Sequence, residues 1–454
     1  MNKSIVLRTD SYKFGHFKQY PQNTTKVFSY IESRGGKFEN SVFFGLQYLI
    51  KEYLTKPVTM EEVEYAKKRT EAHGVPFNYD GWKYIVEKLN GKLPLKIRAV
   101  KEGTIMPVKN VMVTMENTDP KCYWLTSYVE TLLLKVWYPI TVATTSKECK
   151  NIISAFLDET ADSNEGLPFK LHDFGYRGVS SEESAAIGGA AHLVNFMGTD
   201  TFNAIEFLTE HYGADMAGFS IQATEHSTVT SHGREGEFDF YNKFLDITKG
   251  DAIAACVSDS YNIYEAIKMW GKLKDKIVEN EMILVVRPDS GDPISMSLEC
   301  VEHLDREFGS IVNSKGFKLL NNTRVIYGDG IGSPEVIRQI LLNLTKAGYS
   351  ADNLAFGMGG GLLQKLDRDT MKFAMKCSAI EADGKIIEVY KEPITDPGKN
   401  SKRGFLDLIK VNNEYKTIQT PSSIPHKDSE MITYYENGEL LVNQTLEEIR
   451  NLAK

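Results

Sequence analysis

The chain is long enough for two domains and has the composition of an ordinary globular protein. It contains 454 residues, of which 42% are hydrophobic and 25% are charged, so a core large enough to enclose a site is available. The net charge of −8 disfavours a nucleic-acid groove or an anionic membrane surface as the main partner. A local basic pocket for a phosphorylated small molecule is compatible with this charge.

The N-terminus and the cysteines predict a cytoplasmic protein. The sequence MNKSIVLRTDSYK lacks the apolar region of a signal peptide, and apolar runs such as residues 282–286 are far shorter than the roughly 20 residues of a membrane helix. The five cysteines are scattered and lack CxxC spacing. This pattern disfavours a disulfide framework and a cysteine-based zinc site, and we expect reduced thiols.

The expected elements change character along the chain. The first 150 residues mix short strands and helices, with a strand expected at 26–33 and a helix at 60–72. From about residue 170, short apolar segments that end in Gly, Asp or Ser alternate with helical segments, which indicates βαβ units and parallel strands. The polar strand ends lie within residues 172–181, 198–201, 254–260, 283–291, 324–330 and 354–361. We therefore expect a site at the carboxyl edge of an α/β barrel.

The C-terminal part returns to strands and turns. After about residue 375 the sequence carries a hairpin signal at Asn437–Gly438 and a terminal helix is expected at 445–452. We predict an α/β fold in which residues 151–376 form the catalytic barrel. A second, mixed α+β domain is then built discontinuously from residues 1–150 and 377–454.

A glycine-rich loop follows the last strand of this pattern. Residues 357–361 read GMGGG, and consecutive glycines let backbone N–H groups approach an anion. In α/β barrels a loop late in the strand order often holds a phosphate. A tight turn without a ligand is the alternative, since the Gly-Lys-Ser/Thr of a Walker A loop is missing.

Charged side chains gather at the same strand ends. Each of the aspartates could be a helix cap, but four on one rim suit ribose hydroxyls, a Mg²⁺ carried by a diphosphate, or a substrate amide. Two arginines at strand ends add cations where phosphates would need them. The aspartates are Asp200, Asp259, Asp289 and Asp329, and the arginines are Arg177 and Arg287.

A histidine and an aromatic residue complete the candidate site. His226 follows Glu225, and a neutral imidazole oriented by a carboxylate is a competent nucleophile; a structural histidine is the alternative. The spacing from His226 to His232 does not match HExxH, which disfavours zinc. Phe174 lies in a strand-end loop, where it could either cover a flat ligand ring or pack into the core.

Long stretches of the chain resemble the type II phosphoribosyltransferases, and among them the bacterial form of the nicotinamide phosphoribosyltransferase family. The resemblance runs from Thr9 to the C-terminal helix. It rests on the stretches TDSYK, SYIESR, FFGLQY, CYWLTSYVET, WYPITVAT, KLHDFGYRGVSS, HLVNFMGTDT, ATEHST, VSDSYNIY, RPDSGDP and FGMGGGLLQKLDRD. The resemblance implies an irregular α/β barrel beside a second mixed domain, and a head-to-tail homodimer with shared active sites.

The resemblance also implies a reaction. The family transfers the phosphoribosyl group of phosphoribosyl pyrophosphate to nicotinamide, which gives nicotinamide mononucleotide and pyrophosphate in NAD salvage. Mg²⁺, carried mainly by the diphosphate, is the implied cofactor. ATP is the implied co-substrate and phosphorylates His226, with Glu225 and Asp259 as neighbours of the histidine. The alternatives are a nicotinate phosphoribosyltransferase with the same fold, and a non-catalytic nucleotide-binding relative.

Substrate-binding residues follow from the same resemblance. The nicotinamide ring stacks between Phe174 and Tyr12 of the partner subunit, and Asp200 accepts a hydrogen bond from the carboxamide, with Arg287 nearby. A carboxylate at position 200 favours the amide because it repels the acid. Asp289 matches a ribose-binding residue. Around the sugar and its phosphate stand Gly328, Asp329, Gly359, Gly360 and Arg368, and the diphosphate set is Arg177 with Arg34, Lys376 and Lys391 of the partner subunit.

Overall fold

The computed structural model describes residues 4–395 and 400–454, which divide into two compact units. The mixed unit comprises Met1–Thr144, Glu210–Ala214 and Asp367–Lys454, and the barrel unit comprises Thr145–Thr209 and Asp215–Leu366. From the sequence we expect the barrel to extend to residue 376. The mixed unit instead begins again at Asp367, since the strand that comes next pairs with a strand near the N-terminus.

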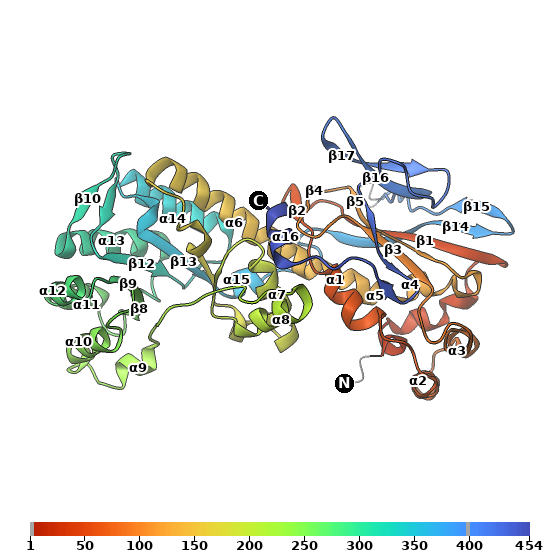
Figure 1. Cartoon of the computed structure of the whole chain (residues 1–454), viewed down its shortest axis with the longest axis horizontal. Helices are drawn as coiled ribbons and strands as arrows, with labels where there is room; N and C mark the ends of the chain where they lie inside the picture. Colours follow the sequence, from red (N-terminus) through yellow and green to blue (C-terminus); the bar gives the residue numbers. More distant parts are fainter. Residues whose placement is uncertain (1–3, 396–399) are drawn as a thin grey trace. The chain divides into compact units, whose positions relative to one another are not determined.

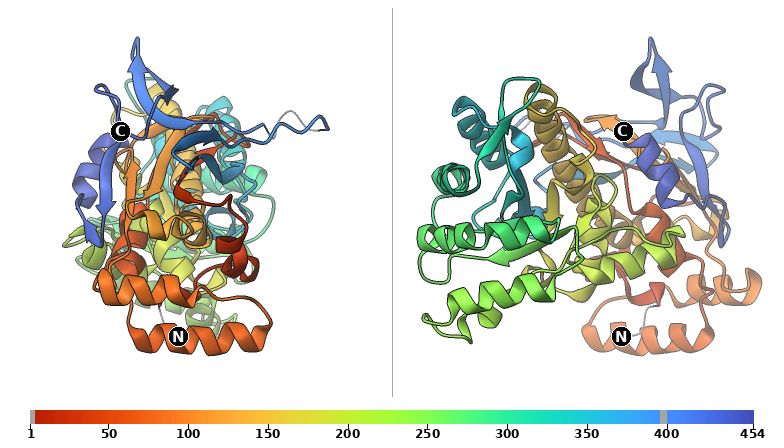
Figure 2. Two further views of the ribbon diagram at one scale, coloured as in Figure 1. Left: turned by 90° about the vertical axis from the view of Figure 1, so that its right-hand side faces the viewer. Right: turned by 60° about the vertical axis from the view of Figure 1, so that its left-hand side comes forward.

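A seven-stranded antiparallel sheet is the centre of the mixed unit. Its order is β15-β14-β1-β5-β3-β18-β19, and the pairs β16–β17 and β2–β4 form two further ribbons. The strands are β1 (Thr24–Ser33), β2 (Asn40–Val42), β3 (Leu95–Ala99), β4 (Ile105–Pro107), β5 (Val111–Asn117), β14 (Phe373–Ala382), β15 (Lys385–Glu388), β16 (Phe405–Val411), β17 (Glu414–Thr420), β18 (Ile432–Glu436) and β19 (Glu439–Leu440). The β16–β17 hairpin extends away from the sheet in both views of Figure 2.

Short helices complete the mixed unit. They are α1 (Leu46–Leu49), α2 (Met60–His73), α3 (Tyr79–Lys88), α4 (Leu125–Tyr128), α5 (Glu130–Leu133) and α16 (Leu446–Leu452). Helix α4 packs against β1 and β5 (Figure 1). The expected hairpin at Asn437–Gly438 is confirmed, because both residues adopt positive φ between β18 and β19. The expected terminal helix is also confirmed, and Thr445 and Glu448 form its capping box.

Six parallel strands form the sheet of the barrel unit. Their order is β7-β6-β13-β12-β9-β8. They are β6 (Leu171–Asp173), β7 (Gly198–Thr199), β8 (Ile253–Val257), β9 (Ile283–Arg287), β12 (Thr323–Tyr327) and β13 (Leu354–Met358), and β10 (Ser310–Val312) and β11 (Lys318–Leu320) form a separate ribbon. The strands are short and largely apolar, as expected for parallel strands that are covered on both faces.

An extended segment at 219–224 closes the ring between β7 and β8. It makes isolated bridges from Gly198 to Phe219 and from Ala223 to Ala255. The Thr199 N–H donates to the Phe219 carbonyl at 3.0 Å on one side of this segment. Going round the ring, the strands therefore follow their order in the sequence, as in an α/β barrel.

Helices surround this ring and fix its shape. They are α6 (Trp137–Thr160), which begins in the mixed unit, α7 (Glu182–His192), α8 (Phe202–Tyr212), α9 (His226–Thr230), α10 (Glu237–Ile247), α11 (Ile263–Lys272), α12 (Lys274–Glu279), α13 (Pro293–Phe308), α14 (Pro334–Lys346) and α15 (Gly360–Leu363). In α14, Ile337, Ile340, Leu341 and Leu344 repeat at helical spacing and are buried. Helix α13 packs against α14, α11 and β12 (Figure 1).

The inside of the barrel is filled by small and branched side chains. Ala255, Val285 and Ile326 form a buried cluster, against which Phe174 and Ile221 pack. The predicted fold class, an α/β barrel with a mixed α+β part, is confirmed. Within residues 4–395 and 400–454, none of the helices combines the length and the apolar character needed to cross a bilayer.

Candidate active site

A cavity of about 810 Å³ opens at the carboxyl edge of the barrel. Its lining includes seven of the residues that the sequence singled out, together with five that it did not. The expected residues are Phe174, Arg177, Asp200, Arg287, Asp289, Gly328 and Gly359, and the others are Tyr176, Val179, Ser180, Ser181 and Glu182. Because all of them belong to the barrel unit, the cavity is defined by that unit alone.

Phe174 lies directly after β6 and separates the cavity from the barrel interior. Its backbone N–H donates to the Met358 carbonyl at 3.1 Å, which anchors the residue to β13. A Cβ atom at Gly357 would overlap the Phe174 ring, and one at Gly328 would lie 3.2 Å from its Cε2 atom. Gly357 therefore makes room for an aromatic ring, a role that differs from the anion binding expected of the glycine-rich loop.

Asp200 is exposed at the end of β7, and one of its oxygen atoms has a partner. The Ser220 hydroxyl donates to Asp200 Oδ1 at 2.6 Å. A carboxylate accepts several hydrogen bonds, so Asp200 can accept another from a ligand. Ser220 belongs to the segment that closes the ring, and sequence analysis missed its role because 20 residues separate it from Asp200.

His226 stands between two of the strand-end carboxylates. Its Nε2 atom is 3.0 Å from Asp259 Oδ1, and its Nδ1 atom is 3.9 Å from Asp289 Oδ2. The side chain of His226 is 43% exposed, whereas that of Asp259 is only 6% exposed. The buried carboxylate thus orients a ring that a dissolved ligand can reach.

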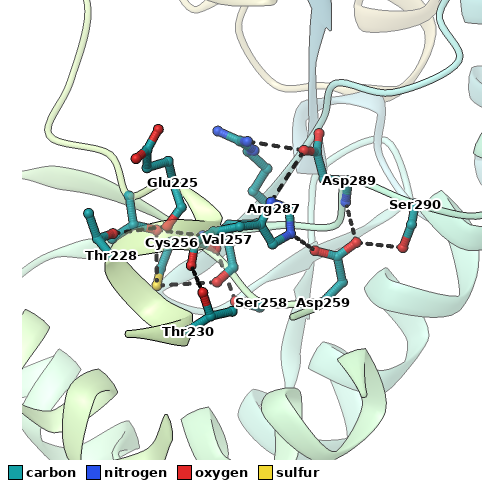
Figure 3. Close-up of polar contacts among 12 residues, drawn as sticks. Glu225, Thr228, Thr230, Cys256, Val257, Ser258, Asp259, Arg287, Asp289 and Ser290 are labelled. Atoms are coloured by element: carbon teal, nitrogen blue, oxygen red, sulfur yellow. Dashed lines mark hydrogen bonds and ion pairs between the residues drawn. The ribbon is translucent and has the colours of Figure 1, made fainter. Parts of the chain in front are cut away.

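Hydrogen bonds in turn hold the two carboxylates. Asp259 Oδ2 accepts from the Asp289 N–H at 2.8 Å and from the Ser290 hydroxyl at 2.6 Å. Arg287 at the end of β9 donates to Asp289 Oδ2 at 3.2 Å. Figure 3 shows this chain of contacts from Arg287 through Asp289 to Asp259 and Ser290. Such a network fixes side-chain positions before a substrate arrives.

Three of the expected site residues lie outside the contacts described above. They are Glu225, Asp329 and Gly360. Glu225 accepts a hydrogen bond from Ser227, and its carboxylate points away from Asp259 in Figure 3. Asp329 is exposed beside the cavity and does not belong to its lining. Gly360 begins α15 directly after Gly359, which does line the cavity.

Four further cations predicted for the site gather in the mixed unit. Lys376 lies on β14, and its pKa is lowered by burial first and then by Arg34, Arg368 and Lys391; Glu130 opposes this shift. Glu130 also pairs with the buried Lys13 at 2.6 Å. Arg368, expected beside the sugar phosphate, thus belongs to this cationic cluster (Arg34, Arg368, Lys376 and Lys391).

Tyr12 precedes Lys13 in the same unit. Its side chain is 64% exposed and packs loosely against the His16 ring, 5.2 Å away. An aromatic ring so exposed is available for contact with a ligand or with another chain. Tyr12 and Lys13 lie in a 3₁₀ helix at Ser11–Lys18, which the Lys13–Glu130 pair links to the cationic cluster.

The acidic residues of the site bear on metal binding. Among the residues that the structure describes, no group of three or more His, Cys, Asp and Glu side chains could hold a metal ion. The oxygen atoms of Asp289 and Asp259 are hard ligands of the type that Mg²⁺ prefers, and the Oδ2 atom of each already accepts a hydrogen bond.

Comparisons with known proteins assign the family. A model of the nicotinate phosphoribosyltransferase family matches residues 169–422, which include the whole cavity. A model of the nicotinamide phosphoribosyltransferase N-terminal domain matches residues 4–97. The chain belongs to the nicotinate phosphoribosyltransferase family.

Individual relatives are similar over nearly the full length. A nicotinamide phosphoribosyltransferase of Xanthomonas campestris is 52% identical, with 98% of this chain and 97% of the relative covered. Another of that name from Acinetobacter baylyi is 31% identical, with 97% and 95% covered.

Solved structures share the fold at low sequence identity. The nicotinate-nucleotide pyrophosphorylase of Pyrococcus furiosus superposes with a TM-score of 0.62 at 16% identity, with 100% of this chain and 95% of that chain covered. Human nicotinic acid phosphoribosyltransferase gives 0.57 at 14% identity, with 98% and 93% covered. These two likenesses support the barrel architecture and the presence of a second domain.

Proposed function

We propose that this chain is an enzyme that transfers the phosphoribosyl group of phosphoribosyl pyrophosphate to nicotinamide. The products are nicotinamide mononucleotide and pyrophosphate. The observation that carries the proposal is the meeting of Phe174, Asp200 and two arginines in one cavity. The names of the relatives that are 52% and 31% identical support the choice of substrate.

The reaction depends mainly on the alignment of the two substrates. The ring nitrogen of nicotinamide attacks C1 of the ribose, the bond from C1 to the diphosphate oxygen breaks, and pyrophosphate leaves with the electron pair. Little proton transfer is required because the leaving group is already an anion. Holding the two substrates in line can contribute roughly 7–11 kcal/mol to lowering the barrier. Arg177 and Arg287 line the cavity and would offset the charge that develops on the diphosphate.

Asp200 would select the amide over the acid. Its carboxylate accepts a hydrogen bond from the carboxamide N–H and repels the carboxylate of nicotinate. Ser220 holds Oδ1 of Asp200, which directs the remaining lone pairs of the carboxylate. Phe174 supplies an apolar face for the pyridine ring.

ATP coupling through His226 is a second part of the proposal. If Asp259 holds a proton on Nε2, the lone pair of Nδ1 is free to attack the γ-phosphorus of ATP. The bond from that phosphorus to the β–γ bridging oxygen breaks, and ADP leaves. The phosphorylated ring would then favour productive substrate binding and capture of the diphosphate, without joining the ribose chemistry.

A homodimer with shared sites is the third part. We infer from the family resemblance that Tyr12 of the partner subunit stacks on the nicotinamide ring. Likewise, Arg34, Lys376 and Lys391 of the partner subunit would bind the diphosphate. The exposure of Tyr12 and the closeness of the three cations to one another within the mixed unit support this inference.

Mg²⁺ and the location in the cell stay predictions. Mg²⁺ would reach the site on the diphosphate, and its role when bound is to neutralise part of the diphosphate charge. All five cysteines are free thiols, as a reducing compartment such as the cytoplasm requires.

A product assay tests the proposal. The purified chain is mixed with phosphoribosyl pyrophosphate, Mg²⁺ and either nicotinamide or nicotinate, with and without ATP, and mononucleotide, pyrophosphate and ADP are measured. We expect equal amounts of nicotinamide mononucleotide and pyrophosphate, with more product when ATP is present. Faster formation of nicotinate mononucleotide would identify the alternative enzyme, and absence of both products would indicate a non-catalytic relative. Sedimentation of the same sample tests the dimer.

A further inference from the structure

Asp173, the last residue of β6, is a buried carboxyl group beneath the cavity. Its side chain is fully buried, and its Oδ1 atom accepts a hydrogen bond from the Gly175 N–H at 2.7 Å. Its backbone carbonyl accepts from the Asp200 N–H at 3.0 Å. Asp173 is therefore hydrogen-bonded to two segments that line the cavity. One is the loop that carries Phe174, and the other is the turn that carries Asp200.

The surroundings of Asp173 are shaped to fit this carboxyl group. The Thr201 side chain lies beside it, directly after Asp200 in the sequence. A Cβ atom at Gly189 in α7 would lie 3.1 Å from Asp173 Oδ2 and 3.0 Å from Thr201 Cγ2. A Cβ atom at Gly175 would lie 3.0 Å from Asp173 Oδ1. The two glycines thus leave space beside the carboxyl group, and they also make room for Leu363 and Ala204, which the added Cβ atoms would meet at 2.6 Å.

Opposing effects act on the pKa of the Asp173 carboxyl group. Burial is the largest cause that raises its pKa, to about 6, and the neighbouring Asp200 raises it further. The hydrogen bond from the Gly175 N–H and the nearby Thr201 hydroxyl lower this pKa and so act in the opposite direction. His172, the preceding residue, is partly buried, and burial lowers its pKa while Asp200 opposes that shift. The carboxyl group of Asp173 is therefore mostly ionised only above a pH of about 6.

We propose that Asp173 is a positioning residue for nicotinamide, which holds Phe174 and Asp200 at the separation that the ring and its carboxamide require. The inference rests on the proposed function, since it assigns the cavity to nicotinamide. Asp173 touches neither substrate. Its side chain acts through the Gly175 N–H, while its backbone carbonyl holds the Asp200 turn. Loss of the side chain therefore displaces the loop that carries Phe174 and affects the nicotinamide end of the site more than the diphosphate end.

Two substitutions and one matched control test this inference. Asp173→Ala removes the acceptor for Gly175, whereas Asp173→Asn keeps an uncharged acceptor of the same shape. Asp305→Asn alters a partly buried carboxylate elsewhere in the barrel unit, on α13, which accepts from the Tyr349 hydroxyl at 2.9 Å. The KM values for nicotinamide and for phosphoribosyl pyrophosphate, kcat and the thermal unfolding midpoint are measured for all variants of the full chain.

We expect Asp173→Ala to raise the KM for nicotinamide selectively. Because a misplacement of about 1 Å can cost about 100-fold in rate, we expect Asp173→Ala to raise the KM for nicotinamide at least about 10-fold, with the other KM within about twofold. Asp173→Asn should restore most of this loss. Asp305→Asn should lower the unfolding midpoint and leave both KM values unchanged.

The pH profile separates positioning from a merely structural role. As the pH falls through about 6, protonation weakens the hydrogen bond from Gly175 to Asp173, and the wild-type KM for nicotinamide should rise. Asp173→Asn already has an uncharged acceptor, so its KM should stay flat across this range and match the wild-type value at low pH. This comparison still holds if Asp173→Ala does not fold.

Two outcomes would overturn the inference. One is an equal rise of both KM values in Asp173→Ala, in proportion to lost stability, as for a structural residue. The other is the same pH dependence in Asp173→Asn as in the wild type. Failure of the proposed function looks different, because the wild-type chain itself would then form no nicotinamide mononucleotide.

Discussion

The two ends of the barrel use charge in opposite ways. At the carboxyl edge a cavity of about 810 Å³ is lined by exposed charged groups such as Asp200 and Arg177. At the amino edge a second cavity of about 460 Å³ is lined largely by apolar residues, among them Ile253, Ile283 and Leu354. Strands β6, β9, β12 and β13 border both cavities, so the chemical difference comes from the residues at the beginning and at the end of each strand.

Charges at the amino edge satisfy one another. The buried Lys170 pairs with Asp352 at 2.8 Å and also donates to the Asp352 carbonyl. Arg324 donates to two backbone carbonyls and lies 3.6 Å from the same carboxylate. At the carboxyl edge, by contrast, Arg177 is exposed at the cavity. Charge at the amino edge therefore stabilises the fold, while the carboxyl edge also presents exposed charge, such as that of Arg177, to ligands.

Substitution of His226 should give the largest effect. In His226→Ala we expect complete loss of the ADP formation that accompanies product formation, because no other nucleophile takes the position beside Asp259 in the proposed scheme. ADP and mononucleotide are measured together. His303→Ala, on the outer helix α13, is the control, and ATP coupling retained by His226→Ala would contradict the assignment.

Gly357→Ala should have the second-largest effect on activity. The added methyl group would overlap the Phe174 ring and force it out of place, so kcat/KM for nicotinamide should fall about 100-fold. Gly166→Ala is a matched control at the amino edge, where a Cβ atom would meet its nearest neighbour at 3.7 Å. Equal activities of the two variants would argue against a stacking role for Phe174.

Asp200→Asn should have an intermediate effect on specificity. Removal of the negative charge weakens the rejection of nicotinate, so the ratio of kcat/KM for amide over acid should fall about 10-fold, or about 1.4 kcal/mol. Competition between the two substrates measures this ratio directly. Asp200→Ser should shift this ratio in the same direction. An unchanged ratio in both variants would mean that Asp200 does not select the amide over the acid.

Asp352→Asn should have the smallest effect on turnover. Lys170 would lose its charged partner, so the free energy of unfolding should fall by about 1–3 kcal/mol, while kcat/KM per folded molecule stays within about twofold of wild type. Chemical denaturation measures the free energy of unfolding, and the product assay measures kcat/KM. A large loss of turnover without a loss of stability would mean that the two ends of the barrel are not functionally separate.

Much of the barrel could be predicted from the sequence because its signals are local. Short apolar runs followed by Gly, Asp or Ser predict parallel strands and their carboxyl ends, and six residues found in this way line one cavity, while Gly328 was added by the family resemblance. The family resemblance added roles to these positions. Neither source indicated the segment at 219–224 that closes the ring, since it makes isolated bridges instead of a regular strand.

The remaining features depend on contacts between distant residues. Ser220 meets Asp200, and Gly357 makes room for Phe174, only once the barrel has closed. The mixed unit begins again at Asp367 instead of residue 377, because the pairing of β14 with β1 joins residues more than 300 positions apart. Asp173 escaped notice because a single buried carboxyl group carries no pattern in a sequence.

A crystal structure of the chain with bound nicotinamide would show whether the cavity at the carboxyl edge is the nicotinamide site. We expect the pyridine ring to lie against Phe174, with the carboxamide nitrogen within hydrogen-bond distance of Asp200, at the carboxyl edge of the barrel. Nicotinamide bound in the apolar cavity at the amino edge, or anywhere away from these two residues, would contradict this expectation.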